Sequence, residues 1–320
     1  MRAAYGRWRH HCDCAEGPRE HRRARRRSCD TRPVDIAVIG AGRAGTAVAV
    51  LWRAAGHRIV AVAGREATRA RAARSLPGVP VLEPADAARD AALVVVGVPD
   101  DTIEPVVGGL AAGGVFMSSR WVAHLSGATP LSALDAARDA GAGRLGVHPL
   151  QTFPDVDAGI ARIPGSTVAV GADDDEGLAV AERLAKDLGG RPFHLPDEHR
   201  AMYHAAAVFA SNYLVAATSV AEQLLEAAGV PDALAALVPL QQATVGNVAR
   251  SGPADALTGP AVRGDAGTIA RNLEALAASA PWAVDAYVEM ARVTLDLAVR
   301  GGRLTQERRV HVDEVLARWS

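Results

Sequence analysis

The sequence predicts an α/β domain with a doubly wound, mostly parallel sheet, followed by an all-helical C-terminal domain. Between residues 34 and 195, apolar runs of strand length alternate with segments whose apolar residues recur at helical spacing. The runs lack polar alternation, which is typical of strands covered by helices on both faces. From residue 196 the strand pattern stops and only helical spacing continues. The expected domains are therefore 34–195 and 196–320, preceded by a leader at 1–33.

Each expected element follows from its own residue pattern. Apolar runs predict strands at 34–40, 58–65, 80–84, 93–99, 115–127, 144–153, 167–172 and 192–195. Helical spacing predicts helices at 41–57, 66–75, 86–92, 130–140 and 177–190. Five helical stretches follow residue 196, separated by segments rich in glycine, proline and serine.

The charge balance limits the classes of partner that the protein could bind. The chain has 36 acidic and 35 basic residues, which argues against a protein built to coat nucleic acid or an anionic membrane. The leader is the exception, with ten arginines against four acidic residues. We interpret it as a disordered basic extension or a segment upstream of the natural start. It holds all three cysteines without a repeated metal-ligand spacing, so we expect no metal site and a reducing, cytoplasmic location.

A glycine-rich turn carries the clearest functional signal. The string GAGRAG follows the first apolar strand and opens the first helix, so it matches the G-x-G-x-x-G turn of dinucleotide-binding Rossmann domains in the required context. Glycines at the first, third and sixth positions permit the tight turn, the approach of a pyrophosphate and close packing of helix on strand. The predicted cofactor-binding residues of this turn are Gly40, Ala41, Gly42, Arg43, Ala44 and Gly45.

The end of the second strand selects the cofactor. Arg65 stands there, 25 residues after Gly40, and favours the 2′-phosphate of NADP. Glu66 is one position later and keeps NAD as the alternative. We also expect Val98, Pro99 and Ser126, which follow the fourth and fifth strands, to line the cofactor site.

Histidine is the natural proton donor in this sequence. The single lysine, Lys186, lies on the charged face of an amphipathic helix, so a lysine mechanism is not expected. His124 and His148 follow strands where parallel sheets bind ligands, and His204 lies in a helix. Each is also compatible with a structural role. The remaining histidines of the folded part, His57, His194, His199 and His311, are predicted to be surface or capping groups.

Two further segments are candidates. Residues 201–221 hold no charged side chain, and we expect one helix buried in protein rather than in a membrane, because its polar side chains are costly in lipid. On such a helix His204 and Ser211 lie about 20° apart, and Asn212 about 80° from His204. The stripe faces a ligand cleft or a neighbouring helix. Arg263, in a glycine-rich loop, could pair with a substrate carboxylate or with an acid across a subunit interface.

The strings GAGRAGTA, VAHLSGA, GVHPLQTF, YHAAAVFASN and ALTGPAVRGD, in this order, resemble bacterial proteins that join a Rossmann-like domain to a domain of unknown function 2520. The resemblance covers about residues 34–300. It implies a nicotinamide cofactor and a helical domain similar to the C-terminal domain of the 6-phosphogluconate dehydrogenase superfamily, which usually dimerises. Relatives in that superfamily use a helix lysine, where this chain has Val208. The Gly-x-His-Pro stretch around His148 is similar to one in prephenate dehydrogenase.

These observations predict an NADP-dependent oxidoreductase that acts on a small carboxylated carbonyl compound, such as a ketopantoate-like 2-oxo acid. The predicted catalytic residues are His148, His204, Asn212, Ser211, His124 and Arg263. We expect a homodimer formed through the helical domain. The alternatives are a non-catalytic NAD(P)-binding sensor and a deazaflavin-linked NADP reductase.

Overall fold

The computed structural model describes residues 32–116 and 120–319. Nearly all of the basic leader therefore lies outside the described residues. The first part of the chain forms one seven-stranded sheet with the strand order β2-β1-β3-β4-β5-β6-β7. The strands are β1 (Asp35–Ile39), β2 (Arg58–Ala63), β3 (Leu93–Val96), β4 (Trp121–His124), β5 (Gly143–Pro149), β6 (Thr167–Ala172) and β7 (Arg191–His194).

The predicted doubly wound, mostly parallel sheet is confirmed. All neighbouring strands pair in parallel except β5 and β6, which are antiparallel. One predicted strand is wrong: in 80–84 only a single bridge forms, between Val81 and Val62 of β2. The proline residues at both ends of this short segment explain its limited pairing, because proline has no amide hydrogen to donate.

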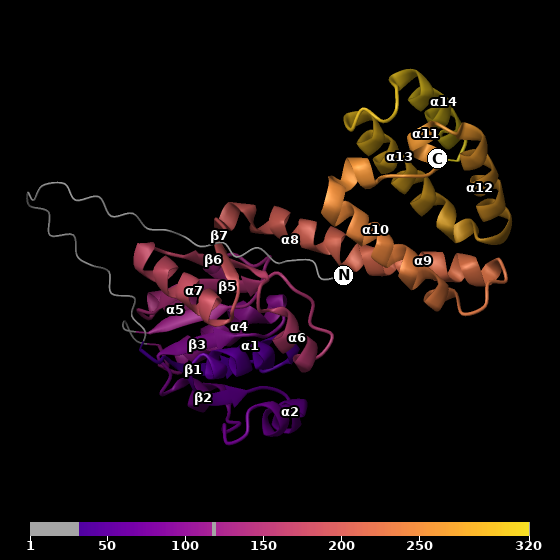
Figure 1. Ribbon diagram of the computed structural model, residues 1–320. Coiled ribbons are helices and arrows are strands. Elements are labelled where there is room, and N and C mark those ends of the chain that lie inside the picture. The colour runs from indigo at the N-terminus through magenta and orange to yellow at the C-terminus, as the bar shows by residue number, and fades with distance from the viewer. Residues whose placement is uncertain (1–31, 117–119, 320) are drawn as a thin grey trace, which may run out of the picture.

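Helices cover both faces of the sheet (Figure 1). Helices α1 (Arg43–Ala54), α6 (Val156–Arg162) and α7 (Asp175–Asp187) pack on one face, while α3 (Pro84–Ala88), α4 (Asp100–Ala112) and α5 (Asp135–Asp139) pack on the other. Helix α2 (Ala67–Ser75) follows β2. The indole of Trp52 is fully buried and donates to the carbonyl of Leu184, 2.9 Å away, which joins α1 to α7.

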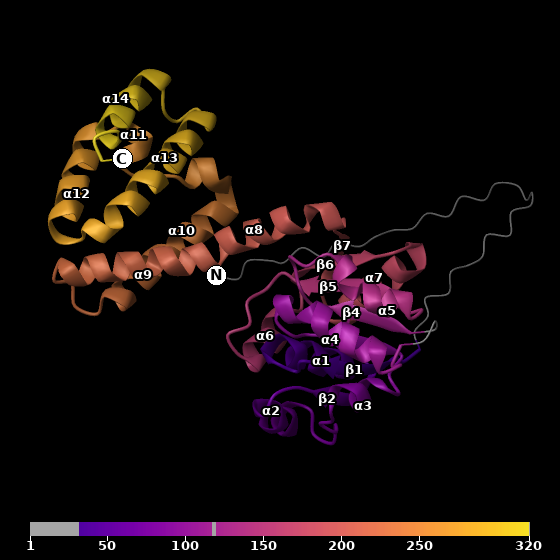
Figure 2. The same cartoon turned by 180° about the vertical axis from the view of Figure 1, so that it is seen from behind.

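The second part of the chain is all helical, as predicted. Its α-helices are α8 (Arg200–Ala210), α9 (Asn212–Ala227), α10 (Ala233–Ala256), α11 (Pro260–Arg263), α12 (Ala266–Ser279), α13 (Val284–Arg300) and α14 (Gln306–Leu316). Figure 1 and the reverse view in Figure 2 show α8 leaving the sheet and α11 to α14 gathered well away from it. A separate apolar core joins α11 to α14, with Leu273, Leu295 and Leu316 fully buried.

The uncharged segment 201–221 differs from the prediction in two ways. It is not one helix, because Ser211 adopts non-helical angles (φ −123°, ψ −68°) between α8 and α9. It is also not buried in its own chain: Met202, Phe209 and Val215 are 77%, 67% and 67% exposed. The cause is the position of these helices, which extend between the sheet and the α11–α14 core (Figure 1). Across the described residues, no helix combines the length and the apolar character needed to cross a membrane.

His57, predicted to be a surface or capping group, is buried. Its Nδ1 accepts from the backbone amide of Val34 at 3.1 Å, and its Nε2 lies 3.0 Å from Asp187. Since Nδ1 acts as acceptor, the neutral ring carries its proton on Nε2 and donates it to the carboxylate. The side chain ties the start of β1 to the end of α7 and has a structural role.

Candidate active site at the carboxyl ends of the strands

The glycine turn lies between the end of β1 and the residues after β3. Gly40 has a left-handed backbone (φ +85°), and a Cβ atom there would lie 2.6 Å from Cγ1 of Val98. A Cβ on Gly45 would lie 2.7 Å from the carbonyl oxygen of Gly40. Both positions therefore require glycine, as the sequence predicted. The turn leads directly into α1, whose first amide groups have no partner within the helix and carry its positive dipole end.

Hydrogen bonds fix this turn from the side of β2. The amides of Gly40 and Ala41 donate to the carbonyl of Ala63 at 2.8 and 3.0 Å. The guanidinium of Arg71, on α2, donates to the carbonyl of Ala41 at 2.8 Å. The backbone that would meet a pyrophosphate is thus fixed by the fold, and it fits that group.

The other predicted cofactor residues lie in the loops after β2, β3 and β4, and Arg43 begins α1. Arg65 lies at an exposed position just after β2, while Arg43 donates to the carbonyl of Pro154 at 3.0 Å. Pro99 directly precedes α4. The hydroxyl of Ser126 donates to Asp100 at 2.8 Å and accepts from the amide of Thr129 at 3.0 Å, so it shapes the loop after β4.

A histidine–tyrosine pair lies at the end of β5. Nδ1 of His148 lies 2.9 Å from the hydroxyl of Tyr203 on α8, and the two rings meet edge to face with centroids 5.5 Å apart. Burial, helped by His204 and Arg200 and opposed by Asp100, lowers the pKa of His148 to about 4. Burial raises the pKa of Tyr203 to about 12. Both groups are therefore uncharged near neutral pH.

The other two candidate histidines lie close to this pair. His124, at the end of β4, is fully buried, and burial followed by the charge of Arg200 lowers its pKa to about 3. Neither of its ring nitrogens has a hydrogen-bond partner among the described residues. His204 follows Tyr203 on α8, and its buried Nδ1 is likewise unpaired within the described part of the chain. The structure thus brings together all three histidines that the sequence singled out.

Three predicted residues are not brought to this site. Ser211 and Asn212 lie at the break between α8 and α9, so the polar stripe calculated for one straight helix does not hold. Arg263 ends α11, which lies far from the sheet in both views (Figures 1 and 2). Its guanidinium is 64% exposed and lies 4.0 Å from Asp265. Asp265 caps α12, accepting from the amide of Thr268 at 3.0 Å.

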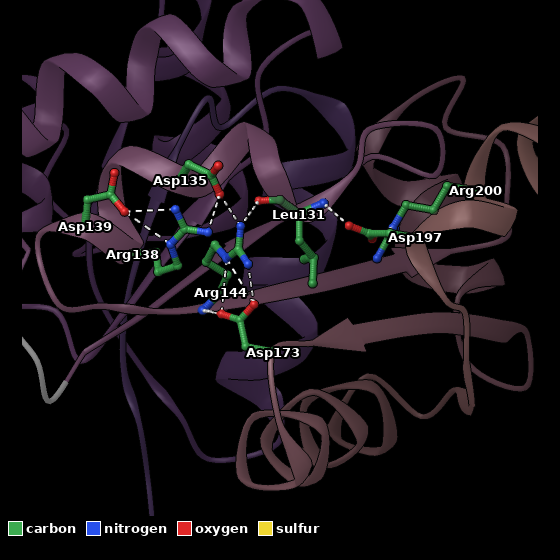
Figure 3. A network of polar contacts seen from close by, with 8 residues as sticks. All are labelled: Leu131, Asp135, Arg138, Asp139, Arg144, Asp173, Asp197 and Arg200. Carbon is green, nitrogen blue, oxygen red and sulfur yellow. Dashed lines mark hydrogen bonds and ion pairs between the residues drawn. The ribbon is translucent and has the colours of Figure 1, made fainter.

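Arg200 and Asp197, which lie beside the histidines, were not predicted from the sequence. Nε of Arg200 donates to Asp197 at 2.6 Å, and the same carboxylate accepts from the amide of Leu131 at 2.7 Å. Figure 3 shows this contact continuing through Leu131 to Arg144 and Asp173. A charged residue before a helix resembles an ordinary surface group in sequence. The available signal was glycine within two strands, at Gly146 and Gly171, which marks a close approach by another group.

The fold and the glycine turn define a protein of the Rossmann-like class with a helical C-terminal part. Sequence comparison makes the assignment specific. Residues 21–149 match the Rossmann-like domain, and residues 166–294 match the domain of unknown function 2520. The chain is therefore a Rossmann-like protein with a C-terminal DUF2520 domain, as its motifs implied.

Solved structures share this two-part fold. A Bacteroides fragilis protein assigned as an NADP oxidoreductase is 24% identical, with a TM-score of 0.72 over 83% of this chain and 100% of its own. The protein TM1727 from Thermotoga maritima is 22% identical, with a TM-score of 0.65 over 83% and 98%. Pyrroline carboxylate reductase from Plasmodium falciparum, solved with NADP bound, is 13% identical, with a TM-score of 0.54 over 83% and 98%. Among proteins of curated function, none matches the sequence.

Proposed function

We propose that the protein is an NADP-dependent oxidoreductase acting on a small carboxylated carbonyl compound, with a 2-oxo acid as the leading substrate class. The observation that carries the proposal is the placement of the His148–Tyr203 pair at the same sheet edge as the glycine turn. Parallel sheets bind ligands at this edge. The names of the Bacteroides and Plasmodium proteins, an NADP oxidoreductase and a reductase solved with NADP, support the same class.

The residues of the glycine turn and α1 would hold the pyrophosphate, and Arg65 would meet the 2′-phosphate. A bound nicotinamide supplies the hydride. His148 is uncharged at neutral pH, so its role differs from that of an imidazolium acid. With the hydroxyl of Tyr203 donating to Nδ1, the ring presents an Nε2 hydrogen to the carbonyl oxygen of the substrate. Neutral imidazole polarises a carbonyl in this way. It would then pass the Nε2 proton to the developing alkoxide while Nδ1 takes the hydroxyl proton of Tyr203, so the ring stays neutral and the negative charge moves to the Tyr203 oxygen.

In a homodimer, Arg263 of the second copy would hold the carboxylate of the substrate. We propose that such a homodimer forms through α8, α9 and α10. Exposed apolar side chains follow these helices, among them Met202, Phe209, Val215, Leu240 and Val245. An uncharged segment such as 201–221 with this much exposed apolar surface is typical of an interface, and a face that pairs with itself around a two-fold axis suits two identical chains.

The cofactor and the chemistry are tested in two steps with the full-length protein. NADPH should raise the melting temperature more than NADH at equal concentration, because the tighter ligand of the native state stabilises it more. A panel of 2-oxo acids and cyclic imine carboxylates should then show NADPH oxidation. Equal or reversed thermal shifts would contradict the NADP assignment. Binding without turnover of any compound would favour the sensor alternative.

The dimer is tested by light scattering after size-exclusion chromatography. Wild type should have twice the chain mass, and Phe209→Glu should have the mass of one chain. Lys186→Glu, on the solvated face of α7, is the matched control and should leave the mass unchanged. A wild-type protein with the mass of one chain would contradict the proposal.

A further inference from the structure

Arg200 is an unusual buried charge. Its side chain is 1% exposed, yet only Nε is paired, with Asp197. Nη1 and Nη2 have no hydrogen-bond partner among residues 32–116 and 120–319. An incompletely paired buried charge costs several kcal/mol, and an apolar side chain of similar volume would fill the same space at lower cost. Stability alone therefore does not account for an arginine here.

The sheet register places this charge next to His148, on the same face of the sheet and two residues back along β5. Gly146 on β5 pairs with His124 on one side and with Gly171 on the other, so these three residues form one row across β4, β5 and β6. The guanidinium of Arg200 covers this row, since a Cβ on Gly171 would lie 2.6 Å from Nη2 and one on Gly146 would be closer still. His148 is two residues beyond Gly146 on the same strand and therefore on the same face. Arg200 can reach this position only because both strands carry glycine there.

Arg200 also sets the start of α8. It is the first residue of that helix, and Tyr203 and His204 follow three and four residues later. Residues with this spacing lie on one helix face, so the side that carries Arg200 to the sheet also carries Tyr203 to His148. Asp197 holds Arg200 and at the same time accepts from the amide of Leu131, which connects the helix start to the rest of the network in Figure 3.

We propose that Arg200 is a positioning residue of the His148 site: it holds the first turn of α8 so that Tyr203 meets His148, and it places a positive charge beneath the histidines. The proposal rests on the proposed function only for its catalytic consequence. The groups that act on His148 are Tyr203 and His204 from α8, Arg200 below it, Asp100 from the start of α4, and His124 from β4. Among them, Arg200 adds a fixed positive charge that opposes protonation of His148 and of His124.

The test uses nuclear magnetic resonance of the histidine rings and does not depend on turnover. The titration of His148, assigned with His148→Gln, reports the charge effect. The Nδ1 chemical shift of His148, calibrated with Tyr203→Phe, reports the hydrogen bond. In Arg200→Met the pKa of His148 should rise toward its ordinary value, and the Nδ1 shift should move toward that of Tyr203→Phe. Arg200→Lys keeps the charge but loses the shape of the guanidinium, so it should move the Nδ1 shift and leave the titration near that of wild type. If Arg200→Met does not fold, Arg200→Lys still tests the hydrogen bond through the Nδ1 shift.

Arg144→Met is the matched control, because Arg144 belongs to the same network and pairs with Asp135 and Asp173. It should lower stability without moving either signal of His148. Unchanged titration and Nδ1 shift in the folded Arg200 variants would overturn the proposal, as would equal changes in Arg144→Met. If these signals move as expected while no compound is turned over, the proposed function fails and the positioning role stands.

Discussion

The hydroxyl of Tyr203 lies 2.9 Å from Nδ1 of His148, so a side chain from the helical part completes a site at the edge of the sheet. Removing that hydroxyl should affect catalysis and leave cofactor binding unchanged, because the glycine turn does not involve α8. We expect Tyr203→Phe to lower kcat about tenfold or more, since positioned proton-transfer groups contribute about 10²–10⁴-fold. Steady-state kinetics and NADPH titration measure the two effects. Full kcat in Tyr203→Phe would exclude the pair from catalysis.

Two arginines near the glycine turn should have separable effects. Arg65→Ala should abolish the preference for NADPH over NADH and leave NADH affinity nearly unchanged, because in the proposed function this exposed side chain meets only the 2′-phosphate. Arg71→Met should weaken both cofactors by the same factor, about tenfold or roughly 1.4 kcal/mol, because Arg71 fixes the carbonyl of Ala41 in the turn. Calorimetric titration of each variant with both cofactors measures these affinities, and each variant serves as the control for the other. A parallel loss of both affinities in Arg65→Ala would mean that Arg65 is structural.

The free energy of unfolding should decrease as the pH is lowered, over a range set by the buried histidines. The pKa values of His148 and His124 are about 4 and about 3 in the folded protein, below the ordinary value of 6.5. The unfolded chain therefore binds protons first, and stability is lost as the pH falls from about 6.5 toward these values. Urea midpoints at about pH 7 and pH 5 measure this loss. His148→Gln should make it smaller, and an identical loss in the variant would show that His148 does not titrate differently in the two states.

His57 should contribute to stability and not to activity. His57→Ala removes the acceptor of the Val34 amide and the donor to Asp187. The Val34 amide loses this acceptor, while Asp187 keeps its ion pair with Arg183. The expected loss is about 2 kcal/mol in the free energy of unfolding, within the usual range for broken buried hydrogen bonds. Urea unfolding measures it, with His311→Ala on α14 as the control. A variant that keeps its stability but loses NADPH affinity would contradict the structural role.

The sequence predicted the parts of the site that depend on local pattern. The glycine turn is specified by neighbouring residues, and His148 stands where a buried strand ends, so both were found. Arg200 and Tyr203 were missed because their roles depend on residues distant in the chain: Gly146 and Gly171 make room for the guanidinium, and β5 presents His148 to α8. The break at Ser211 was also missed, since no glycine or proline marks it. Arg263 was assigned to the site from its glycine-rich loop, but in the structure of one chain it lies at the end of α11, away from the sheet (Figure 1).

The most direct test of the proposed function is to measure the steady-state kinetics of His148→Asn with NADPH and the best 2-oxo acid found for wild type. The change removes the imidazole that would polarise and protonate the carbonyl, while the glycine turn stays intact. We expect kcat to fall about 10²–10⁴-fold with the NADPH dissociation constant unchanged. Full kcat in this variant would contradict the proposed mechanism.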